Sequence, residues 1–202
     1  MLIADIPGPA ICFGPMPRRR RPWAGPFSGR RKGGFAMEAR KNIIGRDDLP
    51  WTESGHGEHF HCRRKQLGAA AGSEKLGCSL YELAPGMSAF PAHYHTANEE
   101  ALYILEGEGT LRLGERRIPV KRGDYVALLP AADAAHRLTN TSDTPLSYLC
   151  ISTMLAPEVT VYPDSNKLGI VAGAAPGGPR EKRTIAKSLR ADADVDYWEG
   201  EK

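Results

Sequence analysis

Short apolar segments, broken by turn-forming residues, make up most of the middle of the chain. The first of them places apolar Leu76, Cys78 and Leu80 at every second position. A period of two puts such side chains on one face of a β-strand. Residues 84–86, Ala-Pro-Gly, are turn formers and end the segment. The pattern therefore predicts a strand with one face toward a core.

Further strands follow at intervals of about 8–12 residues, a spacing typical of a β-sandwich or barrel. They are predicted at residues 101–105, 111–113, 118–120, 125–129, 136–140 and 146–152. Gly114-Glu115 separates two of them as a hairpin turn. The 22 glycines and 16 prolines also favour a turn-rich β protein over a helical bundle. We predict an all-β fold with its barrel over residues 75–152.

The segment before the barrel has two parts. Residues 1–36 are rich in Pro, Gly and Arg and have no periodicity, so they are unsuited to burying a core. They form either a disordered basic tail or a mis-assigned region upstream of a true start at Met37, and we favour the second interpretation. Residues 37–74 are expected to be an N-terminal extension that packs on the barrel, with an edge strand from Phe60 to Leu67.

The segment after the barrel, residues 153–202, is interrupted by four prolines and is less regular. We expect an irregular C-terminal extension that packs over the barrel. Arg180 to Arg190 is predicted to form a short helix, and Tyr197 and Trp198 are expected to anchor the extension, because aromatic side chains bury much apolar surface.

Charge and composition exclude several classes of function. The net charge of +3 comes from 27 basic and 24 acidic residues, and the first 36 residues hold seven of the basic ones and one of the acidic ones. The rest of the chain is mildly acidic, so we expect no nucleic-acid partner. No segment approaches the roughly 20 apolar residues of a membrane span. The four cysteines, Cys12, Cys62, Cys78 and Cys150, include no CxxC pair, and we predict a reduced, cytoplasmic protein.

Candidate metal ligands gather in the predicted barrel. His93 and His95 stand two residues apart, so on a strand both imidazoles point to the same side. A carboxylate, Glu99 or Glu100, follows closely, and His136 comes after a hairpin and two turns. Three imidazole nitrogens and one carboxylate suit one divalent ion of Mn, Fe, Ni, Co or Zn. Such a set leaves coordination positions open for water or a small-molecule ligand.

The order of these residues resembles the two motifs of the cupin family. The first motif runs from Gly86 through the two histidines and the acid to Gly107. The second runs from Gly123 through Pro130 and His136 to Asn140. The resemblance covers about residues 75–152 and implies a double-stranded β-helix, or jelly-roll barrel. It departs from the family pattern by one extra residue within each motif and by Ala132 in place of a glycine, which puts turn geometry in doubt rather than the ligands.

The resemblance also bears on the choice of carboxylate. Strand parity counted from the histidines favours Glu99, but Thr96-Ala97-Asn98 looks like a turn that resets the parity. The family spacing favours Glu100, and we take His93, His95, Glu100 and His136 as the predicted metal ligands. Residues that border the site or its pocket are a separate set of candidates: Glu99, Tyr94, Tyr103 and Asn140.

Function is less determined than fold, because cupins serve many chemistries. The resemblance allows a metal-dependent isomerase, decarboxylase or dioxygenase acting on a sugar phosphate, a carboxylic acid or an oxygenation substrate. We favour such an enzyme, and the alternative is a non-catalytic module that binds or senses a small metabolite. By resemblance we expect a homodimer. A second group, His56, His59 and His61, lies outside the motifs and is expected to be solvated, and Arg63-Arg64-Lys65 forms either a solvated strand face or the cap of an anion pocket.

Overall fold

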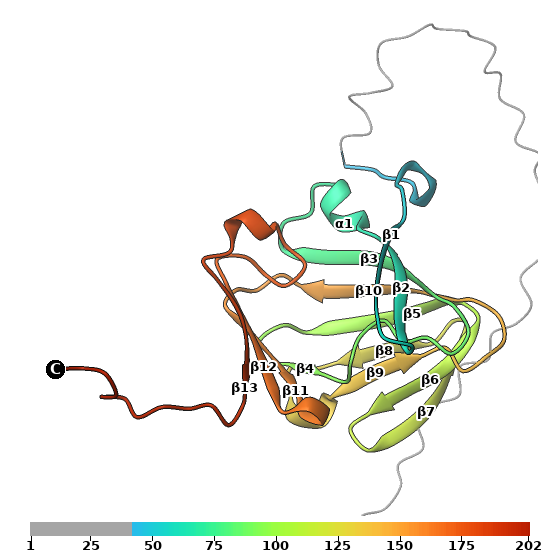
Figure 1. Ribbon diagram of the computed structural model, residues 1–202. Helices are drawn as coiled ribbons and strands as arrows, with labels where there is room; N and C mark the ends of the chain where they lie inside the picture. Colours follow the sequence, from blue (N-terminus) through green and yellow to red (C-terminus); the bar gives the residue numbers. More distant parts are fainter. Residues whose placement is uncertain (1–41) are drawn as a thin grey trace, which may run out of the picture. The chain divides into compact units, whose positions relative to one another are not determined.

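The computed structural model describes residues 42–202, shown in colour in Figure 1. The predictions for residues 1–36, Met37 and Cys12 lie outside the described residues. Strands dominate, and the α-helix α1 is one turn, Leu67–Ala70. The strands are β1 (Thr52–His56), β2 (Phe60–Lys65), β3 (Leu76–Leu83), β4 (Tyr94–His95), β5 (Glu100–Glu106), β6 (Glu108–Leu113), β7 (Arg116–Lys121), β8 (Tyr125–Leu128), β9 (His136–Thr139), β10 (Leu146–Thr153), β11 (Glu158–Tyr162), β12 (Lys167–Ala172) and β13 (Ile185–Arg190). Short 3₁₀ turns are η2 (Arg46–Asp48), η3 (Ala132–Ala134), η4 (Pro163–Ser165) and η5 (Arg180–Lys182).

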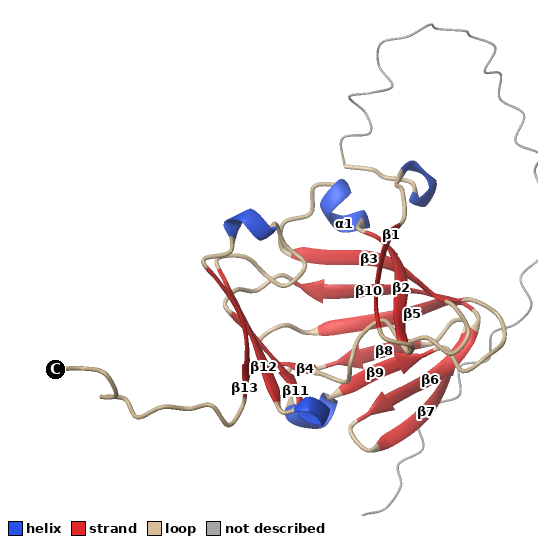
Figure 2. Ribbon diagram, in the orientation of Figure 1, coloured by secondary structure: helices blue, strands red, loops and turns tan. Residues whose placement is uncertain are grey.

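The strands form three antiparallel sheets (Figure 2). The largest has the order β1-β2-β3-β10-β5-β8, and the smaller ones have the orders β13-β12-β11-β4 and β7-β6-β9. A single bridge between His93 and His136 connects the two smaller sheets, so β4 and β9 lie side by side. The predicted all-β architecture is confirmed, and each strand predicted between residues 76 and 152 is present.

The core lies between the large sheet and the three-stranded sheet. Leu83, Ile104 and Leu146 from the large sheet and Leu111 from β6 are at most 2% exposed. On β6 and β9 every second side chain faces the core. Leu111 and Leu138, which are register partners, both belong to the buried cluster. Burial of such side chains contributes about 1.5–3 kcal/mol each. The period-two pattern of the sequence thus corresponds to the inward face of the barrel.

One glycine is required by the geometry of a turn. Gly107, between β5 and β6, has a φ of +80°. A Cβ atom at this position would lie 2.5 Å from the Pro145 carbonyl oxygen. Both the left-handed backbone and the close approach of a second chain segment therefore exclude a side chain.

Three expectations for the extensions are wrong. The strand at Phe60–Lys65 is not an edge strand, because β1 pairs with its outer side. The segment predicted as a helix contains only the turn η5 followed by β13, which pairs with β12 along Ile185–Arg190. Trp198 and Tyr197 are 70% and 83% exposed and pack on each other rather than on the barrel. Among residues 42–202, no helix has the length and apolarity to cross a bilayer.

Candidate metal centre

Backbone pairing holds two of the predicted histidines together. The amide of His93 donates to the carbonyl of His136 at 3.1 Å, and the amide of His136 donates back to His93 at 2.8 Å. Their rings lie 4.6 Å apart between centroids. His136 begins β9 and His93 directly precedes β4. A β-bridge between two sheets therefore places His93 and His136 side by side, although they are 43 positions apart in the sequence.

Each of these rings has one nitrogen occupied by the backbone. Nδ1 of His93 lies 2.8 Å from the carbonyl oxygen of Pro91, and Nδ1 of His136 lies 3.0 Å from that of Ala134. A carbonyl oxygen only accepts, so Nδ1 must carry the proton in both rings. The Nε2 atoms of both rings are left to face the centre, and an imidazole held in this way at Nδ1 can ligate a metal through Nε2.

Glu100 is the carboxylate that reaches the imidazoles. It is the first residue of β5, and its Oε2 lies 3.1 Å from Nε2 of His136 and 3.6 Å from Nε2 of His95. The other oxygen, Oε1, accepts a hydrogen bond from the Cys150 thiol at 2.6 Å. The chain bends before β5, so Glu99 is exposed instead. The potential ligand atoms of His93, Glu100 and His136 all lie within 4.8 Å of one another.

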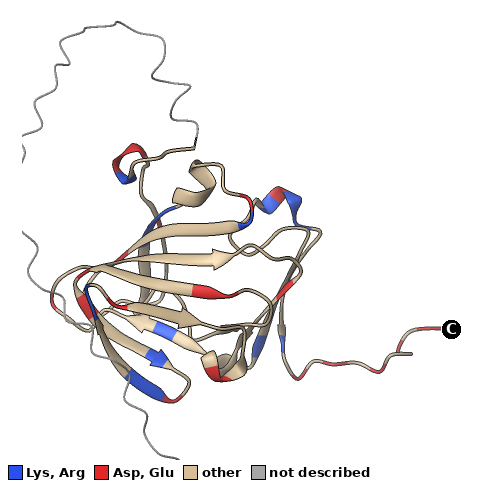
Figure 3. Cartoon of the chain, turned by 180° about the vertical axis from the view of Figure 1, so that it is seen from behind, with Lys and Arg blue, Asp and Glu red and all other residues tan. Residues whose placement is uncertain are grey.

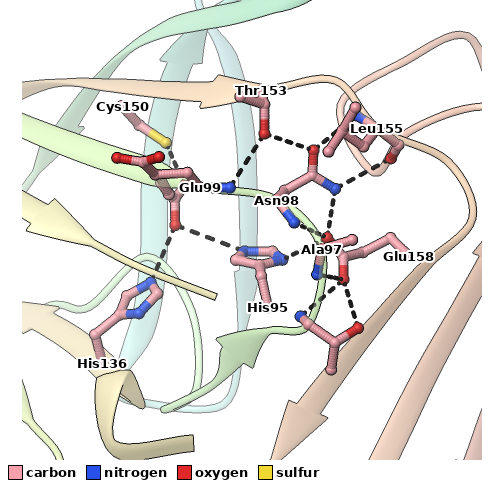
Figure 4. Close-up of polar contacts among 11 residues, drawn as sticks. His95, Ala97, Asn98, Glu99, His136, Cys150, Thr153, Leu155 and Glu158 are labelled. Carbon is pink, nitrogen blue, oxygen red and sulfur yellow. Dashed lines mark hydrogen bonds and ion pairs between the residues drawn. The ribbon is translucent and has the colours of Figure 1, made fainter. Parts of the chain in front are cut away.

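His95 stands slightly apart from this trio and is oriented by a second carboxylate. Its Nδ1 lies 3.5 Å from Oε2 of Glu158 (Figure 4), while its Nε2 faces Oε2 of Glu100. Glu158 is the first residue of β11 and is only 1% exposed. Carboxylate–imidazole contacts of this kind fix the ring and its tautomer at metal sites.

A short loop holds the Glu158 carboxylate. Its Oε1 accepts from the amides of Thr96 and Ala97 at 2.9 and 3.2 Å, and its Oε2 accepts from the amide of Asn98 at 2.9 Å and from the Asn98 side chain. Asn98 in turn accepts from the Leu155 amide at 2.7 Å (Figure 4). The loop that follows His95 is therefore tied to the start of β11 by a buried network.

The electrostatics of the cluster follow from these contacts. Burial away from water lowers the pKa of His93 to about 4, so this ring is neutral at pH 7. Burial opposes ionisation of Glu100, but hydrogen bonds from His136 and His95 outweigh it and hold the pKa of that carboxyl well below its usual value. Burial also lowers the pKa of His95, yet the carboxylates of Glu100 and Glu158 raise it overall. Burial and the adjacent Glu100 raise the pKa of the Cys150 thiol well above its usual value.

The centre opens into a narrow cavity of about 30 Å³. His93, Glu100 and His136 line it together with apolar side chains that include Phe90, Leu102 and Tyr148. One water needs about 10–15 Å³ measured in this way. The cavity thus has room for an ion and one or two water molecules, whereas a larger ligand would have to displace part of its wall.

The other predicted site residues take up different places. Tyr94, Tyr103, Glu99 and Asn140 do not line this cavity. Asn140 is fully buried and donates to the carbonyls of Leu83 and Thr144 at 2.9 and 2.8 Å, so it holds a loop. Within the described residues, the group at His56, His59 and His61 forms no metal-type cluster, and these side chains lie on or beside the β1–β2 hairpin.

Two contributors to the centre were missed from the sequence. Glu158 follows Glu100 by 58 positions, outside the recognised motifs, and only the pairing of β11 with β4 brings it to His95. Cys150 is one of four cysteines with no motif to single it out, yet its thiol donates to Glu100. The one local signal was the alternation in β10, which puts Cys150 on the same face as buried Tyr148.

Sequence and structure comparisons with known proteins support the cupin-like fold. A family model described as "Cupin domain" matches residues 79–152. A crystal structure of a candidate sugar phosphate isomerase from Acidithiobacillus ferrooxidans superposes with a TM-score of 0.64 at 27% identity, over 78% of this chain and 97% of that one. The fold is therefore the predicted double-stranded β-helix.

Two curated relatives are similar in sequence. An uncharacterised protein of Methanocaldococcus jannaschii is 38% identical over 60 residues, which are 30% of this chain and 46% of the relative. The match thus spans about half the length of that protein. A protein of Thermotoga maritima named "oxalate-binding protein" is 27% identical over 124 residues, 61% of this chain and 99% of the relative.

Proposed function

We propose that the segment matching the cupin domain model, residues 79–152, binds one divalent metal ion through His93, His95, Glu100 and His136 to act on a small molecule. The observation that carries the proposal is the convergence of imidazole Nε2 atoms on the Glu100 carboxylate, with Nδ1 of His93 and of His136 held by backbone carbonyls. This donor set fits Mn, Fe, Ni, Co or Zn. A metal held there would supply a Lewis acid for a carbonyl, hydroxyl or carboxylate oxygen.

The residues around the ligands have defined roles in this proposal. Glu158 orients His95, and the backbone carbonyls orient His93 and His136. The Cys150 thiol stays protonated and holds one oxygen of Glu100, which leaves the other oxygen facing the imidazoles. The apolar wall limits the water that reaches the centre, and this strengthens every electrostatic contact inside it.

A metal-dependent isomerase of sugar phosphates is the enzyme class that we favour. The similarity to the candidate isomerase of A. ferrooxidans extends over 97% of that chain, and so includes more than the cupin core. Such an isomerase moves a proton between neighbouring carbons, so its reaction in D₂O incorporates deuterium into the substrate. Sugar phosphates incubated with the metal-loaded protein should therefore gain deuterium, as measured by NMR, and the His93→Ala/His95→Ala variant should show none.

A non-catalytic binding module is the second candidate, and one observation favours it. The titratable side chains in the cavity wall other than His93, Glu100 and His136 include Tyr148 and Cys150, and burial raises the pKa of both well above the usual value. Neither can act as a base at neutral pH. The T. maritima relative is named for binding oxalate. Saturable, metal-dependent oxalate binding in calorimetry, without turnover of any sugar phosphate, would select this candidate.

The metal itself is tested first, because both candidates depend on it. Elemental mass spectrometry of untagged protein should find about one divalent ion per chain, and the His93→Ala/His95→Ala variant should contain none. A matched control is the double variant His56→Ala/His59→Ala, which removes two histidines outside the centre and should keep the metal. A folded wild type without metal after loading with each of the five ions would refute the proposal.

A further inference from the structure

Three arginines lie in one row across the outer face of the β7-β6-β9 sheet. Arg112 of β6 is the register partner of Arg117 on β7 and of Arg137 on β9. Their neighbours Leu111 and Leu138 face the core, so the arginines point to the opposite side of the sheet. Figure 3 shows basic positions on these three adjacent strands in blue. The row thus lies on the face of the sheet opposite Leu111 and Leu138, and only its member Arg137 also lines the cavity at the metal centre.

Like charges directly opposite one another destabilise a sheet. The arginines of the row therefore need negatively charged partners. Arg112 is paired with Asp164 at 2.6 Å and lies 3.8 Å from the exposed Glu115. Within residues 42–202, Arg117 and Arg137 have no carboxylate within ion-pair distance. The Nε atom of Arg137 is buried without a hydrogen-bond partner. Two cations and one buried donor are therefore left without compensation.

Hydroxyl groups complete the wall of the hollow above this row. Thr110, Thr139 and Thr141 line the same depression of about 160 Å³ as the three arginines. The hydroxyls of Thr110 and Thr141 lie 3.0 Å apart, and that of Thr139 lies 2.7 Å from Ser88. Every side chain of this lining offers N–H or O–H donors, and the volume exceeds that of the cavity at the metal centre.

We propose that this depression, lined by Arg112, Arg117, Arg137 and the three threonines, is a second binding site that takes a small oxyanion of the phosphate class. Planar guanidinium groups bind phosphate oxygens through paired, charge-assisted hydrogen bonds. A tetrahedral dianion offers acceptors in several directions, which matches donors from three strands and would satisfy Arg137. Asp164 is the internal carboxylate that holds Arg112 and competes with the anion for it.

The site predicts a specific pattern of affinities. Calorimetry with inorganic phosphate, at constant ionic strength set with chloride, should show one saturable site on the full-length protein. A charge-assisted contact contributes about 1.5–3 kcal/mol, so Arg117→Gln and Arg137→Gln should each weaken binding about ten-fold or more. Asp164→Asn removes the competing carboxylate and should strengthen binding. Arg116→Gln, an exposed neighbour on β7 outside the lining, is the matched control and should bind like the wild type.

Several results would overturn the proposal. These are the absence of saturable phosphate binding, an equal loss in Arg116→Gln, or weaker binding in Asp164→Asn. Binding that occurs only in metal-loaded protein would also refute it, because the anion would then belong to the metal centre. Glycerol 3-phosphate distinguishes the source of the anion: equal affinity indicates free phosphate as the ligand, and tighter binding indicates a phosphate monoester. Far-UV circular dichroism of each variant checks that a loss of binding is not a loss of fold.

Discussion

Replacing Glu158 by glutamine tests whether a residue outside the cupin motifs positions a metal ligand. The carboxylate accepts hydrogen bonds on both oxygens from the loop after His95, and its Oε2 faces His95 itself. Glutamine keeps the size but replaces one acceptor oxygen with an NH₂ donor. At the Oε2 position that donor would face the Asn98 amide, which also donates, and the imidazole of His95 at 3.5 Å. The ring then loses the partner that fixes its orientation.

The size of the effect follows from these contacts. Loss of an outer partner of a metal-binding histidine typically reduces metal affinity about 10–100-fold, which corresponds to about 1.4–2.8 kcal/mol. The buried donors left without an acceptor cost about 1–3 kcal/mol each. The metal-free variant should therefore also be less stable than the wild type, by roughly 2–6 kcal/mol for two such donors.

The assay is a competition titration of Zn²⁺ or Mn²⁺ against a chromophoric chelator, well below the melting temperature of the metal-free variant. Glu99→Gln is the control, since it removes the same charge from an exposed position beside Glu100. We expect Glu99→Gln to bind metal as the wild type does and Glu158→Gln to bind it at least about ten-fold more weakly. If Glu158→Gln is destabilised but binds with unchanged affinity, Glu158 only anchors the loop, and its assignment as a positioning residue is wrong.

Two further predictions concern stability. The pKa of His93 lies at about 4 in the folded chain and near 6.5 in the unfolded chain, so the unfolded state binds more protons between these values. The stability of the metal-free protein should fall from about pH 6.5 to pH 4, by as much as about 3 kcal/mol through this group. Urea titrations measure the free energy of unfolding at each pH for the wild type and for His93→Gln. If the two free energies change with pH in parallel across this range, the reasoning is wrong. Asn140→Ala should lose about 2–4 kcal/mol, because Asn140 also accepts from Ser142 at 3.0 Å and the change leaves several buried groups unpaired. Asp143→Ala, exposed in the same loop, should change stability by less than about 0.5 kcal/mol, and equal losses in the two variants would contradict this role.

The barrel was readable from the sequence because its signals are local. Alternation in β3 and the turn residues between β5 and β8 are properties of neighbouring positions, and such local patterns predicted β3 and β5 to β10, but not the two-residue strand β4. The pair His93 and His95, two positions apart, was equally visible in the sequence. The bend at residues 96–97 then decided the carboxylate, since it places Glu100 rather than Glu99 toward the imidazoles.

The remainder depends on contacts between distant segments. Residues 185–190, Ile-Ala-Lys-Ser-Leu-Arg, are mostly good helix formers. They form a strand because β12 offers an unpaired edge, and tertiary pairing overrides local propensity. Glu158 is likewise an ordinary strand residue by its neighbours in sequence. Its role follows from the pairing of β11 with β4, which no periodicity reports.

The pairing of β4 with β11 also bears on what counts as a module in this protein. The segment that matches the family ends at Ser152, six residues before Glu158. β4 pairs with no other strand of the described chain than β11, and its His95 has its orienting carboxylate there. A boundary drawn at the family match would therefore cut through a sheet and remove a partner of the metal centre. The chain segment needed to build this site is therefore longer than its motifs. A substitution in β4 should be tolerated only together with a compatible residue at the start of β11.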